Sequence, residues 1–250
     1  MTIVDVQRWS SRIGLVLVLI VAAGGRATAT DVTGCGQTVV DRDTGVLQAD
    51  LVCSDDAWAL VLGDRATLAF GGHTITGGGI YCDGKCSLIG PGTVQQVVGS
   101  GSLAAIYVEG PRFSAQDLTL TNNGTGIESY ARKSILTNIT ASNNLQRGIV
   151  VYGSVRAVNV TTNNNGDTGL VSYLRSVRIT GLTATGNGQG GFINNGTSTR
   201  LIDSTVTGNA FAPDPTMLDV FSVRRPRLVN TTCDHSLAPD GETWGICSGD

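Results

Sequence analysis

Four arginines at nearly equal spacing are the residues of this 250-residue chain best suited to chemistry. Each lies three residues before a Gly, Asn or Asp, and they are 22, 22 and 27 residues apart. If a regular fold stacks these positions, their guanidinium groups repel one another unless anions intervene. Guanidinium binds carboxylate or sulfate through paired hydrogen bonds, so the spacing predicts a site for an acidic polysaccharide, although loop carboxylates or planar stacking could also quiet the charges. The arginines are Arg156, Arg178, Arg200 and Arg227.

Three tyrosines recur with a similar period. Tyr130, Tyr152 and Tyr173 are 22 and 21 residues apart, and Phe221 follows two repeats later. Flat rings along a groove can support sugar rings, and their hydroxyl groups supply polar contacts. Aromatic ladders also stabilise stacked strands without any ligand. The tyrosines are therefore candidates for carbohydrate binding, with plain stacking as the alternative.

Acidic side chains that could perform catalysis are few. Glu109 and Glu128 are expected on neighbouring turns, which is the close carboxylate pair that glycoside hydrolysis requires. Arg132 and Lys133 could orient an acidic sugar beside them, and a solvated salt-bridge cluster is the competing interpretation. Asp219 is also expected to face outward, but four coils from Glu128. That is about 19 Å, which is too far for the two to share a metal ion. No metal site is predicted.

Threonine and asparagine form further periodic sets. The threonines are expected to face outward in a flat Thr-x-Thr array that resembles ice-binding β-solenoids, although threonine suits any exposed strand. The asparagines predict an amide ladder or a corner-forming device. The two sets are Thr119, Thr140, Thr161, Thr183, Thr205 and Thr232, and Asn123, Asn144, Asn165, Asn187 and Asn209.

All these sets follow a repeat of about 21 residues. Alternating apolar and polar runs, typical of strands with one buried face, flank a pivot that is always Gly, Asn or Asp. These residues tolerate a left-handed backbone, so each pivot can turn a corner without ending the sheet. The pivots are Gly71, Gly90, Asp117, Asn138, Asn159, Gly181, Asp203 and Asn230.

Three short strands and three corners in each repeat describe a coil, and stacked coils pair their strands in parallel. The outward Thr-x-Thr after an Asn or Gly corner, and the segment Leu68–Gly77, resemble the right-handed parallel β-helix repeats of the pectate-lyase-like superfamily. The resemblance covers residues 59–234. It implies an all-β, single-stranded solenoid of about nine coils with three parallel sheets, and it implies calcium only if the protein is a lyase. The superfamily mixes lyases, hydrolases, epimerases and non-catalytic proteins, so activity stays open.

The remaining segments are interpreted as follows. Residues 1–29 resemble a secretory signal peptide, with two arginines before an apolar run and a small-x-small cleavage signal. Residues 30–58 and 235–250 are expected to cap the β-helix of residues 59–234. Six cysteines after an export signal favour disulfides, and zinc at Cys82 and Cys86 lacks further ligands nearby. The predicted pairs are Cys35–Cys53, Cys82–Cys86 and Cys233–Cys247.

Charge narrows the partners. Without residues 1–29 the chain has 14 basic and 19 acidic side chains, a formal charge of −5, which argues against general nucleic-acid binding. Residues 31–64 carry seven aspartates and one arginine, whereas residues 112–227 carry eleven basic and six acidic side chains. An anionic partner would therefore meet the middle of the chain. We expect a secreted, periplasmic or cell-surface monomer that binds acidic polysaccharide without a cofactor; a polysaccharide lyase, a glycoside hydrolase, an ice-binding protein and a structural surface protein are the alternatives.

Overall fold

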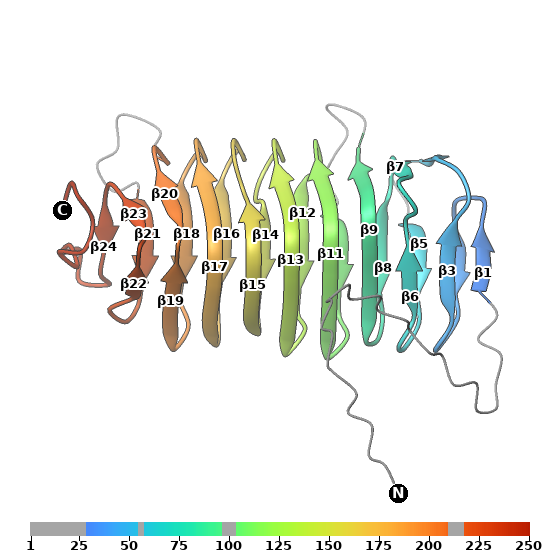
Figure 1. Ribbon diagram of the computed structural model, residues 1–250, viewed down its shortest axis with the longest axis horizontal. Helices are drawn as coiled ribbons and strands as arrows, with labels where there is room; N and C mark the ends of the chain where they lie inside the picture. The colour runs from blue at the N-terminus through green and yellow to red at the C-terminus, as the bar shows by residue number, and fades with distance from the viewer. Residues whose placement is uncertain (1–28, 55–57, 97–103, 210–217) are drawn as a thin grey trace, which may run out of the picture.

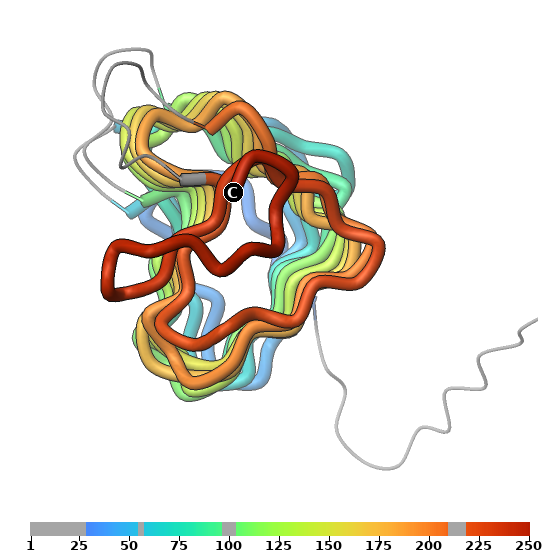
Figure 2. The backbone as a smooth tube through the Cα atoms, turned by 90° about the vertical axis from the view of Figure 1, so that its left-hand side faces the viewer, coloured from blue at the N-terminus to red at the C-terminus, as the bar shows by residue number. Residues whose placement is uncertain are grey.

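The computed structural model describes residues 29–54, 58–96, 104–209 and 218–250, and over these ranges every regular element is a strand. The strands lie side by side along one axis, from β1 (Ala29–Val32) to β24 (Ser236–Leu237) (Figure 1). Seen along that axis, successive turns superpose (Figure 2). Neighbouring strands pair in parallel. The predicted all-β parallel solenoid is therefore confirmed. The signal peptide predicted over residues 1–29 lies outside the described residues, except for Ala29.

One face of the solenoid is a 10-stranded sheet of short strands, which we call the short-strand sheet. It takes one strand from each turn, so the coil count is close to, though not identical with, the predicted nine. Besides β24, its strands are β2 (Gln37–Val39), β5 (Trp58–Leu62), β8 (Gly79–Cys82), β10 (Ala104–Val108), β12 (Thr125–Ser129), β14 (Ile149–Val151), β16 (Thr168–Ser172), β18 (Gly190–Asn194) and β21 (Leu218–Ser222).

The rest of the wall is a 14-stranded bent sheet. Besides β1, its strands are β3 (Thr44–Leu47), β4 (Leu51–Val52), β6 (Thr67–Ala69), β7 (Thr74–Thr76), β9 (Cys86–Gln95), β11 (Arg112–Thr121), β13 (Lys133–Ser142), β15 (Ser154–Thr161), β17 (Ser176–Thr185), β19 (Ser198–Ile202), β20 (Thr205–Thr207), β22 (Arg227–Val229) and β23 (Thr232–Cys233).

The pivots explain why two sheets form where three were predicted. Seven of the eight have φ between +47° and +72°, as their residue types predict. Gly90 is the exception, and there glycine is needed for space, because a Cβ would lie 1.8 Å from the carbonyl oxygen of Asp117. In strands such as β13 and β17 the pivot lies inside one continuous strand. The chain bends there without ending, and two predicted faces merge.

Inward positions build the core as columns of apolar side chains. The third-strand column of the prediction is fully buried in the short-strand sheet, and the column after each pivot is at most 2% exposed. Because the alternation has period two, the residues between them face outward. The two buried columns are Ile106, Ile127, Ile149, Leu170 and Phe192, and Leu118, Ile139, Val160 and Leu182.

The predicted asparagine ladder runs through the interior. From Asn123 to Asn209, each Nδ2 donates to the side-chain oxygen of the next member at 2.7 to 3.1 Å, and each backbone N donates to the same oxygen. Asp219 is the last acceptor, and its other oxygen accepts from the backbone N of Asp234 and His235. Asp219 is only 3% exposed. The prediction that it faces outward is wrong, because its carboxylate ends the ladder.

Two of the three predicted disulfides are present, Cys35–Cys53 and Cys233–Cys247, with Cα atoms 5.7 and 5.0 Å apart. The third is wrong: Cys82 and Cys86 are free thiols, 0% and 3% exposed. Cys82 pairs in register with Val108 and Cys86 with Phe113, so both act as small apolar core residues. Burial, with a hydrogen bond to Cys86, raises the pKa of the Cys82 thiol.

Both segments expected to act as caps contribute strands to the sheets of the solenoid. Residues 30–58 contain β2 to β4, and β3 pairs in parallel with β1 and β6. In residues 235–250 the carboxylate of Asp250 accepts from the backbone N of Ser236, Ile246 and Cys247. Burial by itself raises the pKa of Asp250, but the bond from the Ser236 hydroxyl and these backbone bonds outweigh it and lower the pKa. The last loop is therefore tied to β24.

Candidate functional site

The four predicted arginines form a stacked column on the outer surface of the bent sheet. Arg156 pairs with Arg178, Arg178 with Arg200, and Arg200 with Arg227, in adjacent strands of one register. Their neighbours on β15, Val155 and Ala157, are 3% and 1% exposed, which turns the arginine between them outward. Parallel strands lie about 4.8 Å apart, so each turn brings one guanidinium alongside the next.

The positive column continues through four more turns that the sequence analysis did not align with it. Arg112 pairs with Lys133, and the register of the preceding strands places Lys85 and then Arg65 one turn earlier each. These four residues stand two positions nearer the strand start than the arginines, because Lys133 pairs with Ser154 while Ile135 pairs with Arg156. Alignment by strand start rather than by pivot would have found them.

We call the eight residues the cationic stripe: one cation on each of eight successive turns. Among the described residues its one ion pair joins Arg65 Nε to Asp64 Oδ2 at 3.6 Å. Nε of Arg200 is buried without a hydrogen-bond partner. The stripe is therefore a row of like charges with little internal compensation. Its members are Arg65, Lys85, Arg112, Lys133, Arg156, Arg178, Arg200 and Arg227.

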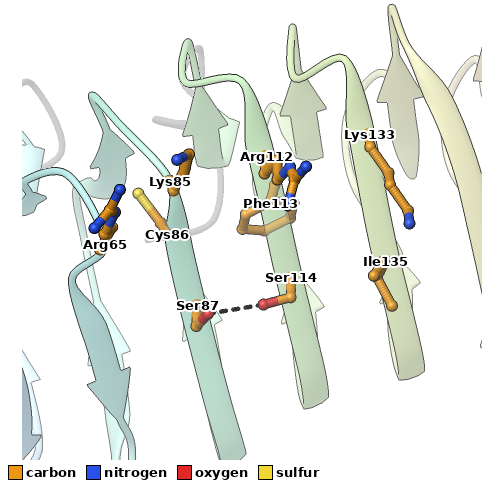
Figure 3. Close-up of a pocket in the computed structure, with 9 residues that line it drawn as sticks. All are labelled: Arg65, Lys85, Cys86, Ser87, Arg112, Phe113, Ser114, Lys133 and Ile135. Atoms are coloured by element: carbon orange, nitrogen blue, oxygen red, sulfur yellow. Dashed lines mark hydrogen bonds between the residues drawn. The ribbon is translucent and has the colours of Figure 1, made fainter. Parts of the chain in front are cut away.

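Grooves follow the stripe. One, of about 320 Å³, has four cations of the stripe around it, as Figure 3 shows. A second, of about 130 Å³, lies between Lys133, Arg156 and Arg178. A third, of about 320 Å³, is lined by Arg156, Arg178, Val158 and Thr180 among others. The positive side chains therefore border a series of hollows along the outer face of the bent sheet.

The tyrosines form a longer aromatic ladder than predicted. Tyr130 and Tyr152 stack with ring centroids 4.3 Å apart and planes inclined by 5°, and Tyr152 and Tyr173 stack at 4.9 Å and 15°. The ladder continues toward the N-terminus through Tyr107, Tyr81 and Trp58, with neighbouring centroids 5.5 to 6.0 Å apart. The stacked ring faces cover one another, so edges and hydroxyl groups remain for other contacts.

The register explains why the first half of the ladder was missed. Tyr81 pairs with Tyr107, but Tyr107 pairs with Glu128, two residues before Tyr130. The ladder therefore changes column, which a search at constant period does not detect. Phe221 was expected to extend the tyrosine column, and this is wrong: it pairs with Ile193, whereas Asn195 follows Tyr173.

The two candidate catalytic glutamates are bound to this ladder. The hydroxyl of Tyr81 donates to Glu109 at 2.6 Å, and that of Tyr130 donates to Glu128 at 2.9 Å. The hydrogen bond to Glu109 raises the pKa of Tyr81 to about 12. Burial and the bond to Glu128 raise the pKa of Tyr130, and burial with both glutamates nearby raises that of Tyr107.

Arg132 and Lys133 lie in and just after the corner that follows Tyr130, both exposed. Lys133 begins β13 and belongs to the cationic stripe, while Glu128 lies in β12 of the short-strand sheet. Within the described ranges neither cation forms an ion pair with Glu109 or Glu128. The glutamates are thus neighbours of tyrosine hydroxyls, and Lys133 lines grooves of the cationic stripe.

The threonine column is longer than predicted. It begins two turns earlier and runs unbroken over eight turns in one register along the part of the bent sheet that follows the pivots. A parallel column contains threonine, serine and glutamine but is interrupted by Asn163, whose side-chain oxygen accepts from the backbone N of Thr185. The first column consists of Thr74, Thr93, Thr119, Thr140, Thr161, Thr183, Thr205 and Thr232.

Metal binding and membrane spanning are two further classes of function to consider. No group of three or more His, Cys, Asp or Glu side chains is placed to hold a metal ion in the part of the chain that the structure describes. In the same residues, no helix has the length and apolar character needed to cross a bilayer.

Comparison with known proteins identifies one family. The family described as right-handed β-helix region matches residues 60–211, which is more than half of the chain and contains most of the cationic stripe and the aromatic ladder. Neither the curated proteins nor the solved structures that were searched give a match. The right-handedness that the resemblance implies is that of the matched family.

Proposed function

Since the chain belongs to the right-handed β-helix family, we propose that it is a carbohydrate-binding member of that family whose cationic stripe holds an extended acidic polysaccharide. The observation that carries the proposal is one outward cation on each of eight successive turns, of which Arg65 alone forms an ion pair within the described residues. At about 4.8 Å per turn the stripe spans roughly 34 Å. An extended polymer with an acidic group on each sugar offers charges at a comparable interval.

The chemistry of the side chains favours carboxylate or sulfate as the anion. Guanidinium groups form two parallel hydrogen bonds with either group, and like charges in a row repel until an anion lies between them. Binding would therefore relieve repulsion that the free protein retains.

The tyrosines take a secondary part in this proposal. The ring faces of Tyr130, Tyr152 and Tyr173 are stacked on one another, so sugar rings would meet their edges and hydroxyl groups. We place the protein in an oxidising compartment, secreted, periplasmic or on the cell surface, because the disulfides Cys35–Cys53 and Cys233–Cys247 persist there. We propose no cofactor for binding and a monomer as the working form.

Gel retardation with polygalacturonate, dextran sulfate and neutral dextran tests this function. The charged polymers should retard the protein and neutral dextran should not. Arg178→Ala should weaken retardation about tenfold, the cost of one charged hydrogen-bonded contact. Arg147→Ala is the matched control, because it removes the same charge from a residue outside the stripe. Arg147 Nε pairs with Asp167 Oδ2 at a distance of 2.9 Å. Equal effects of both variants, or no retardation, would overturn the proposal.

The same incubation separates binding from catalysis. Polygalacturonate is followed for unsaturated product and new reducing ends, with calcium and with chelator. An intact polymer supports a binding protein. Product formation would instead favour the lyase or hydrolase alternative, and loss of product in Glu109→Gln or Glu128→Gln would then assign the glutamates to it.

The unbroken column of eight threonines favours ice binding as a second candidate function. It presents one hydroxyl and one methyl group per turn on a regular strand lattice. Thermal hysteresis of the purified protein tests it. Activity that Thr161→Tyr removes and Arg178→Ala leaves intact would establish this function, and absence of hysteresis would reject it.

A further inference from the structure

The two halves of the cationic stripe have different shapes. Over the first four turns the cation stands at the strand start, and two positions later the column holds Ser87, Ser114 and Ile135. From the fifth turn onward the arrangement is exchanged: arginine takes the later position, and Ser154 and Ser176 stand at the strand start. In the first half the cations therefore border a hollow whose floor carries serine and isoleucine, whereas in the second half, which we call the arginine ridge, the guanidinium groups themselves line the grooves.

The hollow has the components of a binding site for a short charged sugar. Arg65, Lys85, Arg112 and Lys133 surround about 320 Å³, and none of the described residues that line it is acidic, although Asp64 pairs with Arg65 beside it. Figure 3 shows them at the starts of successive turns, with the hydroxyl groups of Ser87 and Ser114 further along the strands. These hydroxyls are 2.8 Å apart and hydrogen-bond to each other. Charged, hydroxyl and apolar groups therefore face one space.

The apolar part of the lining matches a sugar ring. The lining includes Ile135, which is 40% exposed, and Phe113, which is only 2% exposed. Ligand sites commonly combine apolar walls with a few convergent polar groups. Three strand intervals separate Arg65 from Lys133, about 14 Å along the axis. That length suits two or three sugar units.

We propose that this hollow is a subsite that binds a short acidic oligosaccharide, of two or three units, independently of the arginine ridge. The subsite rests on the proposed function, since it would fix the position of the longer polymer on the stripe. The cations bind the carboxylate or sulfate groups, the two serine hydroxyls bind ring hydroxyls, and Ile135 contacts the ring. Carboxylate and sulfate share this chemistry, and the ligands of the test separate them.

Isothermal titration of the full chain with trigalacturonate, a sulfated disaccharide and uncharged trigalactose tests the subsite. At least one acidic ligand should bind with 1:1 stoichiometry, and the uncharged one should not. Arg112→Gln should weaken that binding about tenfold, as loss of a charge-assisted contact predicts. Arg178→Gln, an equal charge change on the ridge, should leave it unchanged. Arg112 and Arg178 are exposed, and circular dichroism checks that each variant folds.

The outcomes separate this subsite from the proposed function. If polygalacturonate binds in an Arg178-dependent manner while short acidic ligands fail to bind, the subsite is rejected and the polysaccharide function stands. If short ligands bind but are equally sensitive to Arg112→Gln and Arg178→Gln, a separate hollow is also rejected. If neither short nor long acidic ligands bind, both proposals fall. Ser114→Val adds a local test, because it should weaken short-ligand binding without changing charge.

Discussion

The aromatic ladder and the cationic stripe are built by the same repeat, but neighbouring side chains attract one another in the ladder and repel one another in the stripe. In the ladder, Tyr152 lies between two rings at 4.3 and 4.9 Å, so stacking attracts each member to its neighbours. In the stripe, Arg178 lies between Arg156 and Arg200 in register, so each member is repelled by its neighbours.

This difference shows how stacked columns can be interpreted. A column whose members attract one another stabilises the solenoid and needs no partner. A column whose members repel one another costs stability in the free protein, and an external counter-charge removes that cost. Repetition alone therefore does not mark a ligand site, whereas repetition of uncompensated charge does.

The largest expected effect is on the ladder. Tyr152→Ala removes two stacked pairs and part of the buried ring area, and it should lower the free energy of unfolding by about 2 to 3 kcal/mol. Urea denaturation followed by circular dichroism measures this. Tyr152→Phe keeps the stacking and should stay near the parent protein. A similar loss in Arg178→Ala would remove the distinction between the two columns.

A smaller effect concerns the hydroxyl groups of the ladder. The pKa of Tyr81 is raised to about 12 by Glu109, above its ordinary value of 10.0. A raised pKa in the folded state stabilises the fold fully below pH 10, and this contribution is lost as pH rises from 10 through 12. In Glu109→Gln the phenolate absorbance of Tyr81 should therefore appear at lower pH. An unchanged titration curve would show that Glu109 does not control Tyr81.

The smallest effect should have the opposite sign. Arg178→Thr removes one like charge from between two others and places a strand-favouring residue there, so stability should rise by about 0.5 kcal/mol at low salt. In concentrated salt the charge part of the gain should disappear, because screening already weakens the repulsion. Denaturant midpoints at both salt concentrations measure it. A loss of stability at low salt would show that the stripe contributes favourably to the free protein.

Much of the fold could be predicted because it depends on local residue types. Asn138, Asn159 and Gly181 have the left-handed backbone that these residue types tolerate, and the arginine column follows from their spacing. The parts that were missed depend on register across irregular turns. Tyr107 aligns with Glu128 rather than Tyr130, and Lys133 stands two positions from the arginine column.

Local spacing also misled where the interior decided the outcome. Cys82 and Cys86 are close in sequence, but both are core members of different sheets, and their thiols are free. Asp219 follows the alternation of an outward acid, yet it is buried because the last asparagine needs an acceptor. Neither requirement can be seen in the spacing of the repeat.

Asp219 also has a consequence for the length of the asparagine ladder. Each asparagine side chain has both an acceptor and a donor, so a ladder of amides can be extended by one member with each added turn. A carboxylate has two acceptor oxygens and no donor for a next member. Its second oxygen accepts from the backbone N–H groups of Asp234 and His235 in the next turn. The carboxylate of Asp219 therefore ends the ladder. In Asp219→Asn the side-chain Nδ2 donor would face the backbone N–H donors of Asp234 and His235.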